Sequence, residues 1–526
     1  MALRPQHPFL SFYLSSHSLH HSPPFSLYSS SPPLSSPSSK SFTSKPSNHS
    51  PPPPVCHNSQ TSPTSAYVHL PFCRKRCHYC DFPIIALGSS PSLSRIKDYI
   101  SLIQTEISST TPTKSVDSHP PLQTIFFGGG TPSLVPPSLV AQILDSLSKK
   151  FGFSLSPKVE ISIEMDPGTF DASSLSSFLS LGVNRVSLGV QAFQNELLKV
   201  CGRAHCLDHV RESLEIIKSS GLENWSLDLI SSLPNQSLEM WEESLRAAIE
   251  SGAPHLSVYD LQVEEGTKFG AWYKPGQSPL PSEEESAMFY RKAWELLSKA
   301  GYEHYEISSY CKRGMECKHN MGYWLNKPYY GFGLGAASYV GGIRFTRSRR
   351  MKDYARYVEL LESERTREKE IEGLERGGSE SENKGMVGVT VIGGLERGEE
   401  RESESGRLVG RESVWEGVRE SESEVVMDAI MLSLRMGRGL EVAGFRGRFG
   451  EEILERVCRA LRPYVESGHV LPLDEDRRTL SAVDFVRFCE SRMQNKSVEY
   501  IRLSDPDGFL LSNELISVAF ASLSSS

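Results

Sequence analysis

The sequence predicts an α/β fold, in which a partial (β/α)6 barrel is followed by a smaller C-terminal domain of helical or winged-helix type. Between residues 66 and 300, short apolar, β-branched runs alternate with polar segments that have helical spacing. The runs recur at intervals of roughly 30 residues or more, which is typical of βαβ units in a parallel sheet. Six such units are too few for a closed eight-stranded barrel, so a partial barrel is the simplest arrangement.

The barrel elements follow one another in a regular order. Strands are expected at residues 66–70, 122–127, 158–164, 183–190, 225–230 and 255–261. Helices are expected at residues 93–107, 138–149, 208–218, 238–249 and 283–300. Residues 63–300 therefore form the predicted barrel. Residues 301–361, rich in aromatic residues and glycine, form a predicted mixed subdomain attached to it.

The composition changes sharply after this region. Residues 362–424 are dominated by Glu, Arg, Ser and Gly, and the string GLERG occurs twice among them. Such a segment has too little apolar surface to offset the entropy lost on ordering, so we expect a disordered insertion. The helical pattern returns in the predicted C-terminal domain, residues 425–526. Helices are expected there from 425 to Gly437, at 451–464 and at 513–520, with a strand near 470–473.

The N-terminal segment, residues 1–62, has a composition of its own. It is crowded with Ser, Pro and His, and the first acidic residue of the chain is Asp81. Serine-rich segments that lack acidic residues are typical of organelle transit peptides, and the scarcity of arginine favours the chloroplast over the mitochondrion. The alternative is a disordered tail without a targeting role.

Overall composition narrows the class of protein. The chain has 526 residues, a formal net charge of −8 and 38% hydrophobic residues, which suits a soluble protein of two or three domains. Mild acidity gives no electrostatic footprint for nucleic acid. No apolar run approaches the ~18–20 residues that a transmembrane helix needs. Ten cysteines scattered over this length favour a reducing compartment.

Three cysteines follow the first expected strand, in the stretch AYVHLPFCRKRCHYCDF at residues 66–82. Cys73, Cys77 and Cys80 have the spacing C-x3-C-x2-C. A zinc site needs a fourth ligand, for which His78 is the nearby candidate. An iron–sulfur cubane usually takes four cysteines, so three would leave one iron open to another ligand. Unrelated thiols are the third possibility, and a disulfide framework does not suit so long a chain.

Polar residues at the ends of the later strands are further site candidates, because functional groups of parallel barrels gather there. A glycine triplet can bring the backbone close to a ligand, and it can equally be a tight turn. A lone acid at a strand end can bind a ligand or cap a helix. An acid inside an apolar run must be paired or functional. The candidates are Gly129, Gly130, Thr131, Glu164, Gln191, Arg203 and Asp228.

The cysteine spacing after a first strand resembles the signature of the radical S-adenosylmethionine (SAM) superfamily, whose fold is the partial (β/α)6 barrel. The fuller string YVHLPFC…CHYCDF resembles the branch that contains oxygen-independent coproporphyrinogen III oxidases and HemW-type heme chaperones. This resemblance implies that Cys73, Cys77 and Cys80 bind a 4Fe-4S cluster. It also implies that the open iron binds the amino and carboxylate groups of SAM.

The same resemblance implies roles for the strand-end residues. The string FFGGGTPS resembles the GGE-type motif that holds the methionine end of SAM, with Thr131 where many relatives have glutamate. Glu164, Gln191, Arg203 and Asp228 match positions that bind one or two SAM molecules. Tyr67 and Tyr79 match aromatic positions that line SAM and shield the cluster. An alternative for Asp228 is a structural ion pair with Arg203.

A second motif, H-N-x-x-Y-W, begins at His319. It resembles the motif of this branch that is associated with heme or porphyrin binding, and imidazole is a usual ligand of heme iron. The alternative is that His319 and its aromatic neighbours pack the 301–361 subdomain against the barrel.

Position 82 separates two functions within the branch. The oxidases carry a further cysteine two residues after the third cluster cysteine, and this chain has Phe82 there. The resemblance therefore implies a heme chaperone that binds a 4Fe-4S cluster, SAM and heme. Its expected partners are a heme-acceptor protein and an electron donor for the cluster. The alternative is an enzyme that oxidatively decarboxylates coproporphyrinogen III.

Overall fold

The computed structural model describes residues 62–88, 93–112, 119–155, 158–376, 407–408, 417–419, 421–490 and 498–524. The predicted N-terminal leader lies outside these residues except for Ser62, and so does most of the predicted insertion.

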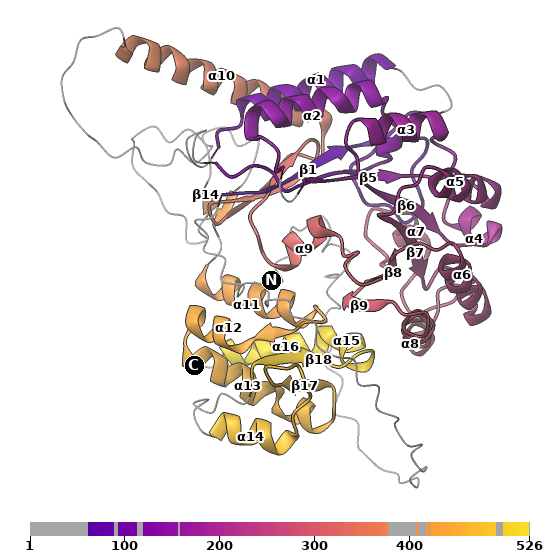
Figure 1. The fold of residues 1–526 in the computed structure, drawn as a ribbon, viewed down its shortest axis with the longest axis vertical. Helices are drawn as coiled ribbons and strands as arrows, with labels where there is room; N and C mark the ends of the chain where they lie inside the picture. The colour runs from indigo at the N-terminus through magenta and orange to yellow at the C-terminus, as the bar shows by residue number, and fades with distance from the viewer. Residues whose placement is uncertain are drawn as a thin grey trace.

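A nine-stranded sheet forms the centre of the larger domain (Figure 1), in the order β11-β1-β4-β5-β6-β7-β8-β10-β9. Its six middle strands are mutually parallel neighbours in chain order, which confirms the predicted (β/α)6 arrangement. They are β1 (Ser65–Leu70), β4 (Thr124–Gly129), β5 (Glu160–Met165), β6 (Arg185–Gln191), β7 (Trp225–Ser231) and β8 (His255–Asp260).

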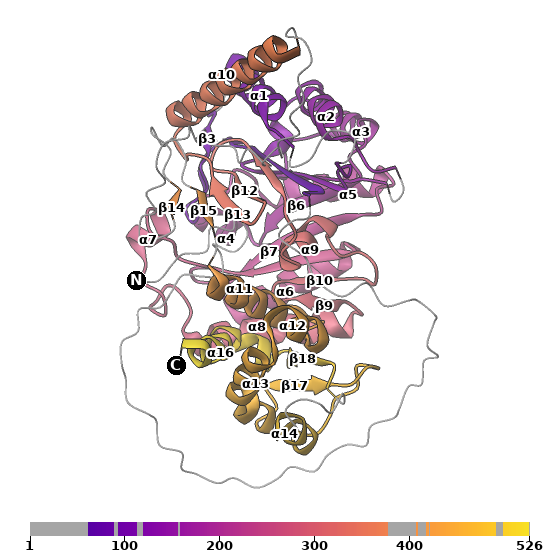
Figure 2. The same ribbon diagram turned by 90° about the vertical axis from the view of Figure 1, so that its left-hand side faces the viewer.

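Helices cover the outer side of this sheet, as Figures 1 and 2 show. In the first helix, Ile96, Ile100, Ile103 and Ile107 form one buried stripe at helical spacing. Short helices of one or two turns lie at the strand ends: η3 (Pro132–Leu134), α4 (Asn195–Val200) and α7 (Lys268–Trp272). The long helices are α1 (Leu93–Ser109), α2 (Pro137–Phe151), α3 (Ala172–Ser180), α5 (Leu207–Ser219), α6 (Leu238–Glu250) and α8 (Glu283–Lys299).

The 301–361 region completes both edges of the sheet. β9 (Glu303–Glu306) and β10 (Ser309–Cys311) extend it beyond β8 with antiparallel pairing. β11 (Tyr330–Phe332) pairs parallel with β1 on the other edge. Between them lies α9 (Lys318–Trp324), and β12 (Ala337–Val340) and β13 (Ile343–Thr346) follow as a hairpin. Near the barrel mouth, β2 (Phe72–Cys73) pairs with β3 (Ile85–Ala86).

The boundary predicted at residue 361 differs from the structure. Helix α10 comprises Met351–Arg376, so the first part of the predicted disordered insertion is helical. The physical reason lies in its first turns, where Tyr354, Val358 and Leu361 are buried in the main core and start a helix that then continues. Two further pieces, β14 (Arg407–Leu408) and β15 (Gly417–Arg419), extend the β12–β13 sheet.

The C-terminal domain has a separate core, and its helical character confirms the prediction (Figure 2). A small antiparallel sheet, β16 (Leu440–Glu441), β18 (Tyr500–Leu503) and β17 (Val470–Leu473), packs with the helices. The domain joins the barrel edge at β9 and β10, where Ile307 N donates to Arg435 O at 3.0 Å. Its helices are α11 (Glu422–Leu434), α12 (Val442–Phe449), α13 (Glu451–Glu466), α14 (Ala482–Glu490), α15 (Asp507–Leu510) and α16 (Ser512–Ser524). Within the described residues, no helix has the length and apolar character needed to cross a membrane.

A buried ion pair fastens the 301–361 region to the barrel. Arg347 Nε lies 2.7 Å from Glu106 Oε1, and the two side chains are 3% and 0% exposed. The second carboxylate oxygen accepts hydrogen bonds from Gly333 N at 2.9 Å and Tyr354 Oη at 2.7 Å. One carboxylate on α1 therefore holds the loop after β11, the β12–β13 hairpin and α10.

We predict that Glu106→Ala lowers the free energy of unfolding by about 3–5 kcal/mol, because it leaves the Arg347 guanidinium buried without its counter-charge. Urea unfolding followed by circular dichroism measures this. Asp98→Ala, an exposed change on the same helix, serves as the control. A loss of less than about 1 kcal/mol for Glu106→Ala would contradict the assignment.

Candidate functional site

The cysteine loop lies at the carboxyl ends of the parallel strands, where ligand sites of barrels form. Strand β1 ends at Leu70, Pro71 follows, and Cys73 lies in β2. Cys73, Cys77 and Cys80 are all half-buried free thiols.

His78 anchors the loop to the barrel. Its backbone N donates to Cys201 O at 2.8 Å, and its ring Nδ1 lies 2.8 Å from Val200 O. The ring also packs edge-on against Trp272, with 4.9 Å between centroids. Its Nε2 lies against Gly202, where an added Cβ would be 2.7 Å away. His78 therefore docks the cysteine loop on α4, α7 and the turn at Gly202.

The three thiols lie near one another but do not form a preassembled metal site. Burial raises the pKa of Cys73 to about 12, with smaller contributions from Asp166, Cys80 and Cys77. The thiols are thus close enough to influence one another. Among the described residues, no three His, Cys, Asp or Glu side chains are gathered as a metal site. Metal uptake would therefore have to draw the thiolates together and release their protons.

The glycine triplet at the end of β4 is hydrogen-bonded to the start of the cysteine loop. Gly130 N donates to Leu70 O at 2.9 Å, and Thr131 N donates to Phe72 O at 2.6 Å. A Cβ at Gly130 would lie 2.6 Å from the carbonyl carbon of Pro71, so no larger residue fits without displacement. The Thr131 hydroxyl donates to Cys73 Sγ at 3.6 Å. This threonine therefore contacts the Cys73 thiol directly.

Glu164, on β5, also contacts the glycine triplet. Gly129 N donates to its Oε2 at 3.0 Å. Burial raises the pKa of Glu164 to about 8, and the neighbouring carboxylate of Asp228 raises it further than Asp166 does. A carboxyl group held protonated at a strand end is suited to a cationic ligand, since a nearby positive charge favours its ionised form.

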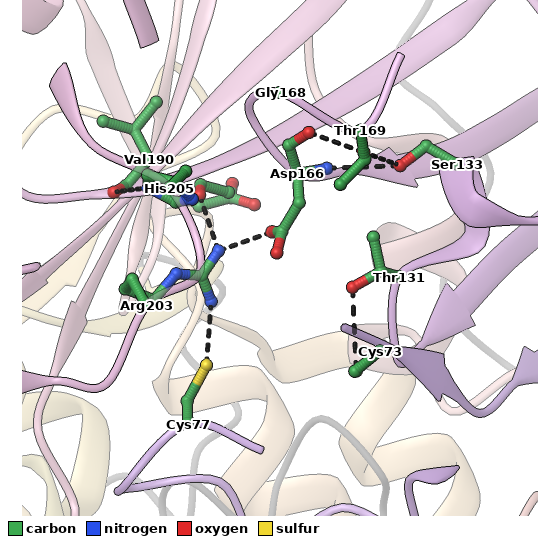
Figure 3. Close-up of polar contacts among 12 residues, drawn as sticks. Cys73, Cys77, Thr131, Ser133, Asp166, Gly168, Thr169, Val190, Arg203 and His205 are labelled. Carbon is green, nitrogen blue, oxygen red and sulfur yellow. Dashed lines mark hydrogen bonds and ion pairs between the residues drawn. The ribbon is translucent and has the colours of Figure 1, made fainter. Parts of the chain in front are cut away.

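Arg203 joins the cysteine loop to the strand ends (Figure 3). Its Nη2 lies 2.5 Å from Asp166 Oδ1 and donates to Gly189 O at 2.9 Å. Its Nη1 donates to Tyr79 Oη at 3.1 Å and to Cys77 Sγ at 3.5 Å. Its Nε is buried and has no hydrogen-bond partner within the part of the chain that the structure describes. An anionic group of a ligand would satisfy that N–H.

The structure does not pair Asp228 with Arg203, which corrects that alternative. Asp228 accepts hydrogen bonds from Ser187 Oγ at 2.8 Å and Ser226 Oγ at 3.4 Å. Burial raises its pKa, and the serine hydroxyls oppose this. A ring of hydroxyl donors around a buried carboxylate satisfies its oxygens on the side facing β6 and β7.

Gln191 ends β6 in a conformation that side chains rarely adopt, with φ at +73°. The pairing of β6 with β7 shifts register at this point, as in a β-bulge. A Cβ at Gly189 would lie 3.0 Å from Gln191 Nε2 and 3.1 Å from Asp166 Oδ1, so the amide borders the Arg203–Asp166 pair. The bulge turns this side chain toward the site.

The two tyrosines lie on different sides of the site. Tyr79 packs near Phe269 and accepts the bond from Arg203, next to the cysteine loop. Tyr67 is buried in β1, and its Oη lies 3.2 Å from His69 Nδ1. A Cβ at Gly128 would lie 3.0 Å from the Tyr67 ring, so Tyr67 forms the floor beneath the glycine triplet.

Asp166 and His69 are site residues that the sequence analysis missed. Asp166 is two residues beyond Glu164 at the end of β5, and His69 is two residues beyond Tyr67. Because side chains in a strand alternate between faces, each shares a face with the residue that was identified. The alternation of side chains along the strand was therefore the feature of the sequence that could have identified Asp166 and His69.

His319 corrects the expected heme ligand. It is 1% exposed, with Nδ1 2.8 Å from Thr124 Oγ1 and Nε2 2.9 Å from Tyr323 Oη. The ring stacks on Phe126 at 5.2 Å, and burial lowers its pKa to about 3. Both ring nitrogens are bonded inside the protein, so His319 packs α9 against β4 and offers no lone pair to a heme iron.

Comparison with known proteins identifies the family of this chain. The family model described as the radical SAM superfamily matches residues 67–248. The protein named Heme chaperone HemW from Synechocystis sp. is 36% identical over 463 residues, which cover 88% of this chain and 97% of that protein. The chain belongs to the HemW family of radical SAM proteins.

Other HemW relatives and one solved structure agree with this assignment. The Heme chaperone HemW of Bacillus subtilis is 37% identical over 297 residues, covering 56% of this chain and 76% of its own length. The structure of coproporphyrinogen III oxidase (HemN) from Escherichia coli, a radical SAM enzyme, superposes with a TM-score of 0.61 over 88% of this chain and 91% of that one. At 19% identity this likeness shows the shared fold alone.

The raised pKa of Glu164 in this HemW-family protein predicts a pH-dependent stability. The favourable contribution of the protonated carboxyl is complete below the ordinary value of 4.5 and is lost as the pH rises through about 8. Glu164→Gln keeps the neutral form, so we expect its melting temperature to exceed that of the wild type by roughly 2–4 °C at high pH and to match it at low pH. Differential scanning calorimetry across this range measures the difference, and a constant offset would contradict the assignment.

The buried position of His319 predicts a structural effect. His319→Ala should lower the free energy of unfolding by about 2–4 kcal/mol, because it leaves a cavity and removes the hydrogen bonds to Thr124 and Tyr323. Any heme absorption band that the wild type shows should remain in variant protein that is still folded. Chemical unfolding and a heme titration measure the two effects, with His469→Ala as the control. Wild-type stability with a lost heme band would restore His319 as the ligand.

Proposed function

We propose that this protein is a heme chaperone that binds a 4Fe-4S cluster, SAM and heme, and transfers heme to an acceptor protein. The observation that carries this proposal is the 36% identity with a protein named Heme chaperone HemW over 97% of that protein's length.

The site geometry supports the cofactor part of the proposal. Cys73, Cys77 and Cys80 would bind three irons, and the fourth iron would be open to SAM. When bound, the cluster can supply an electron to SAM. The Glu164 carboxylate would accept from the SAM amino group, while Arg203 Nε would donate to an anionic group of SAM. Arg203 also donates to Cys77 Sγ at 3.5 Å, so it would hold one of the ligand side chains in place.

The second candidate is oxygen-independent oxidation of coproporphyrinogen III. The resemblance of the string YVHLPFC…CHYCDF to the branch that contains the oxidases favours it. Phe82 argues against this activity. The resemblance implies that the oxidases have a further cysteine at this position. In this structure the Phe82 carbonyl accepts from Arg76 Nη1 at 2.8 Å, so the position closes the cysteine loop.

The two candidates separate in one experiment. Anaerobically reconstituted protein is incubated with SAM, a reductant and coproporphyrinogen III, and products are followed by chromatography. A parallel titration with heme follows the Soret band. We expect stoichiometric heme binding without protoporphyrinogen. Formation of protoporphyrinogen would overturn the chaperone proposal.

Cys73→Ala provides a matched prediction. The variant should lose the 4Fe-4S absorption and bind SAM at least ~10-fold more weakly, because its cluster lacks a ligand. Heme binding should persist, since the proposal gives Cys73 no contact with heme. Cys489→Ala, in the C-terminal domain, is the control. Loss of heme binding in Cys73→Ala alone would show that the cluster and heme share a site.

The composition of residues 1–62 supports a further proposal, that they direct the protein to an organelle and to the chloroplast in preference to the mitochondrion. Fusion of these residues to a fluorescent protein tests it. Retention of the fusion in the cytosol would contradict it.

A further inference from the structure

Exposed positive charge lies on the solvent side of the cysteine loop. Arg74, Lys75 and Arg76, between the first two cluster cysteines, are all exposed. Arg349 and Arg350 are exposed as well, and the Arg349 side chain is 59% accessible. The whole chain has a formal net charge of −8, so this concentration of cations differs from the average surface.

Contacts show that these cations border one surface. Arg76 Nη1 donates to Cys80 O at 3.0 Å, so this side chain folds over the third cysteine. Arg349 Nη2 lies 3.7 Å from Asp81 Oδ2, one residue further along the same loop. Asp81 thus offsets part of the positive charge on this surface.

An exposed aromatic residue adjoins the loop. The Trp272 side chain is 53% exposed, although its ring packs edge-on against His78, between the second and third cysteines. Lys268 Nζ lies 5.8 Å from the Trp272 ring centroid. Tryptophan and arginine are the residues most enriched at the energetic centres of protein interfaces.

We propose that this surface docks an acidic one-electron carrier protein. The donor-docking face consists of Lys75, Arg76, Lys268, Trp272, Arg349 and Arg350. This inference rests on the proposed cluster, which lies directly behind the face at Cys73, Cys77 and Cys80. In the docked complex the carrier gives up one electron and is oxidised by one electron, the cluster is reduced by one, and no bond is made or broken.

Charge complementarity is the reason for proposing an acidic electron carrier as the partner of this face. A cationic surface attracts an acidic partner, speeds its encounter and fixes its orientation. An electron carrier also needs its redox group close to the cluster, and the face overlies the loop that holds the cluster ligands. Nucleic acid would need an extended basic surface, whereas this chain is acidic overall.

The test uses the full, reconstituted protein and an acidic [2Fe-2S] ferredoxin as the probe. Binding is measured by calorimetry at about 20 mM and about 200 mM salt, where screening differs strongly. The test variant is Lys268→Glu with Arg350→Glu, two exposed residues of the face that lie outside the cysteine loop. The control is Lys218→Glu with Arg487→Glu, which makes the same change in net charge on α5 and α14.

We expect the test variant to weaken binding at low salt by about 10-fold or more and to flatten the salt dependence, with the control within about 2-fold of the wild type. Equal losses in both variants, or none in the test variant, would overturn the docking face. So would equally tight binding of a comparably acidic protein that has no redox group.

A heme titration on the same samples separates this inference from the proposed function. Ferredoxin binding without heme binding would overturn the chaperone proposal and leave the docking face standing. Heme binding without ferredoxin binding would overturn the docking face alone.

Discussion

The barrel mouth depends on one guanidinium group. Arg203 reaches from the loop after α4 to Asp166 just after β5, to Gly189 on β6, and to both Tyr79 and Cys77 on the cysteine loop. The group is 8% exposed, so breaking its ion pair would leave a buried charge at a cost of about 3–5 kcal/mol. The loop with the cluster cysteines therefore has a defined position before any cofactor binds. Hydrogen bonds from the glycine triplet and Thr131 hold the other end of this loop.

Much of this could be predicted from the sequence. Alternating apolar runs predicted the six parallel strands, because strand and helix periods differ and each βαβ unit repeats them. The cysteine spacing located the loop, strand ends located Glu164 and Gln191, and the acid inside an apolar run located Asp228. Arg203 was identified from its place twelve residues after Gln191. Their partners could not be predicted. Arg203 pairs with Asp166 and not Asp228, because the register between β5, β6 and β7 decides which carboxylate it reaches.

The errors have a common cause in tertiary packing. His319 has the residue type and aromatic neighbours of a heme ligand, yet Thr124 and Tyr323 bind both its nitrogens. Composition predicted disorder from residue 362, whereas α10 continues from the turns that its buried tyrosines anchor. In both cases a local pattern was overruled by contacts with residues distant in sequence.

Hydrogen exchange on the cluster-free protein tests most directly whether Arg203 positions the cysteine loop. The informative amides are those of His78 and Cys80, which donate to Cys201 O and Cys77 O. In the wild type we predict protection of both amides, and in Arg203→Met we predict faster exchange at both, with β1 and β4 unchanged. Equal exchange in the two proteins would contradict the role of Arg203 and would mean that only the bound cofactors order the loop.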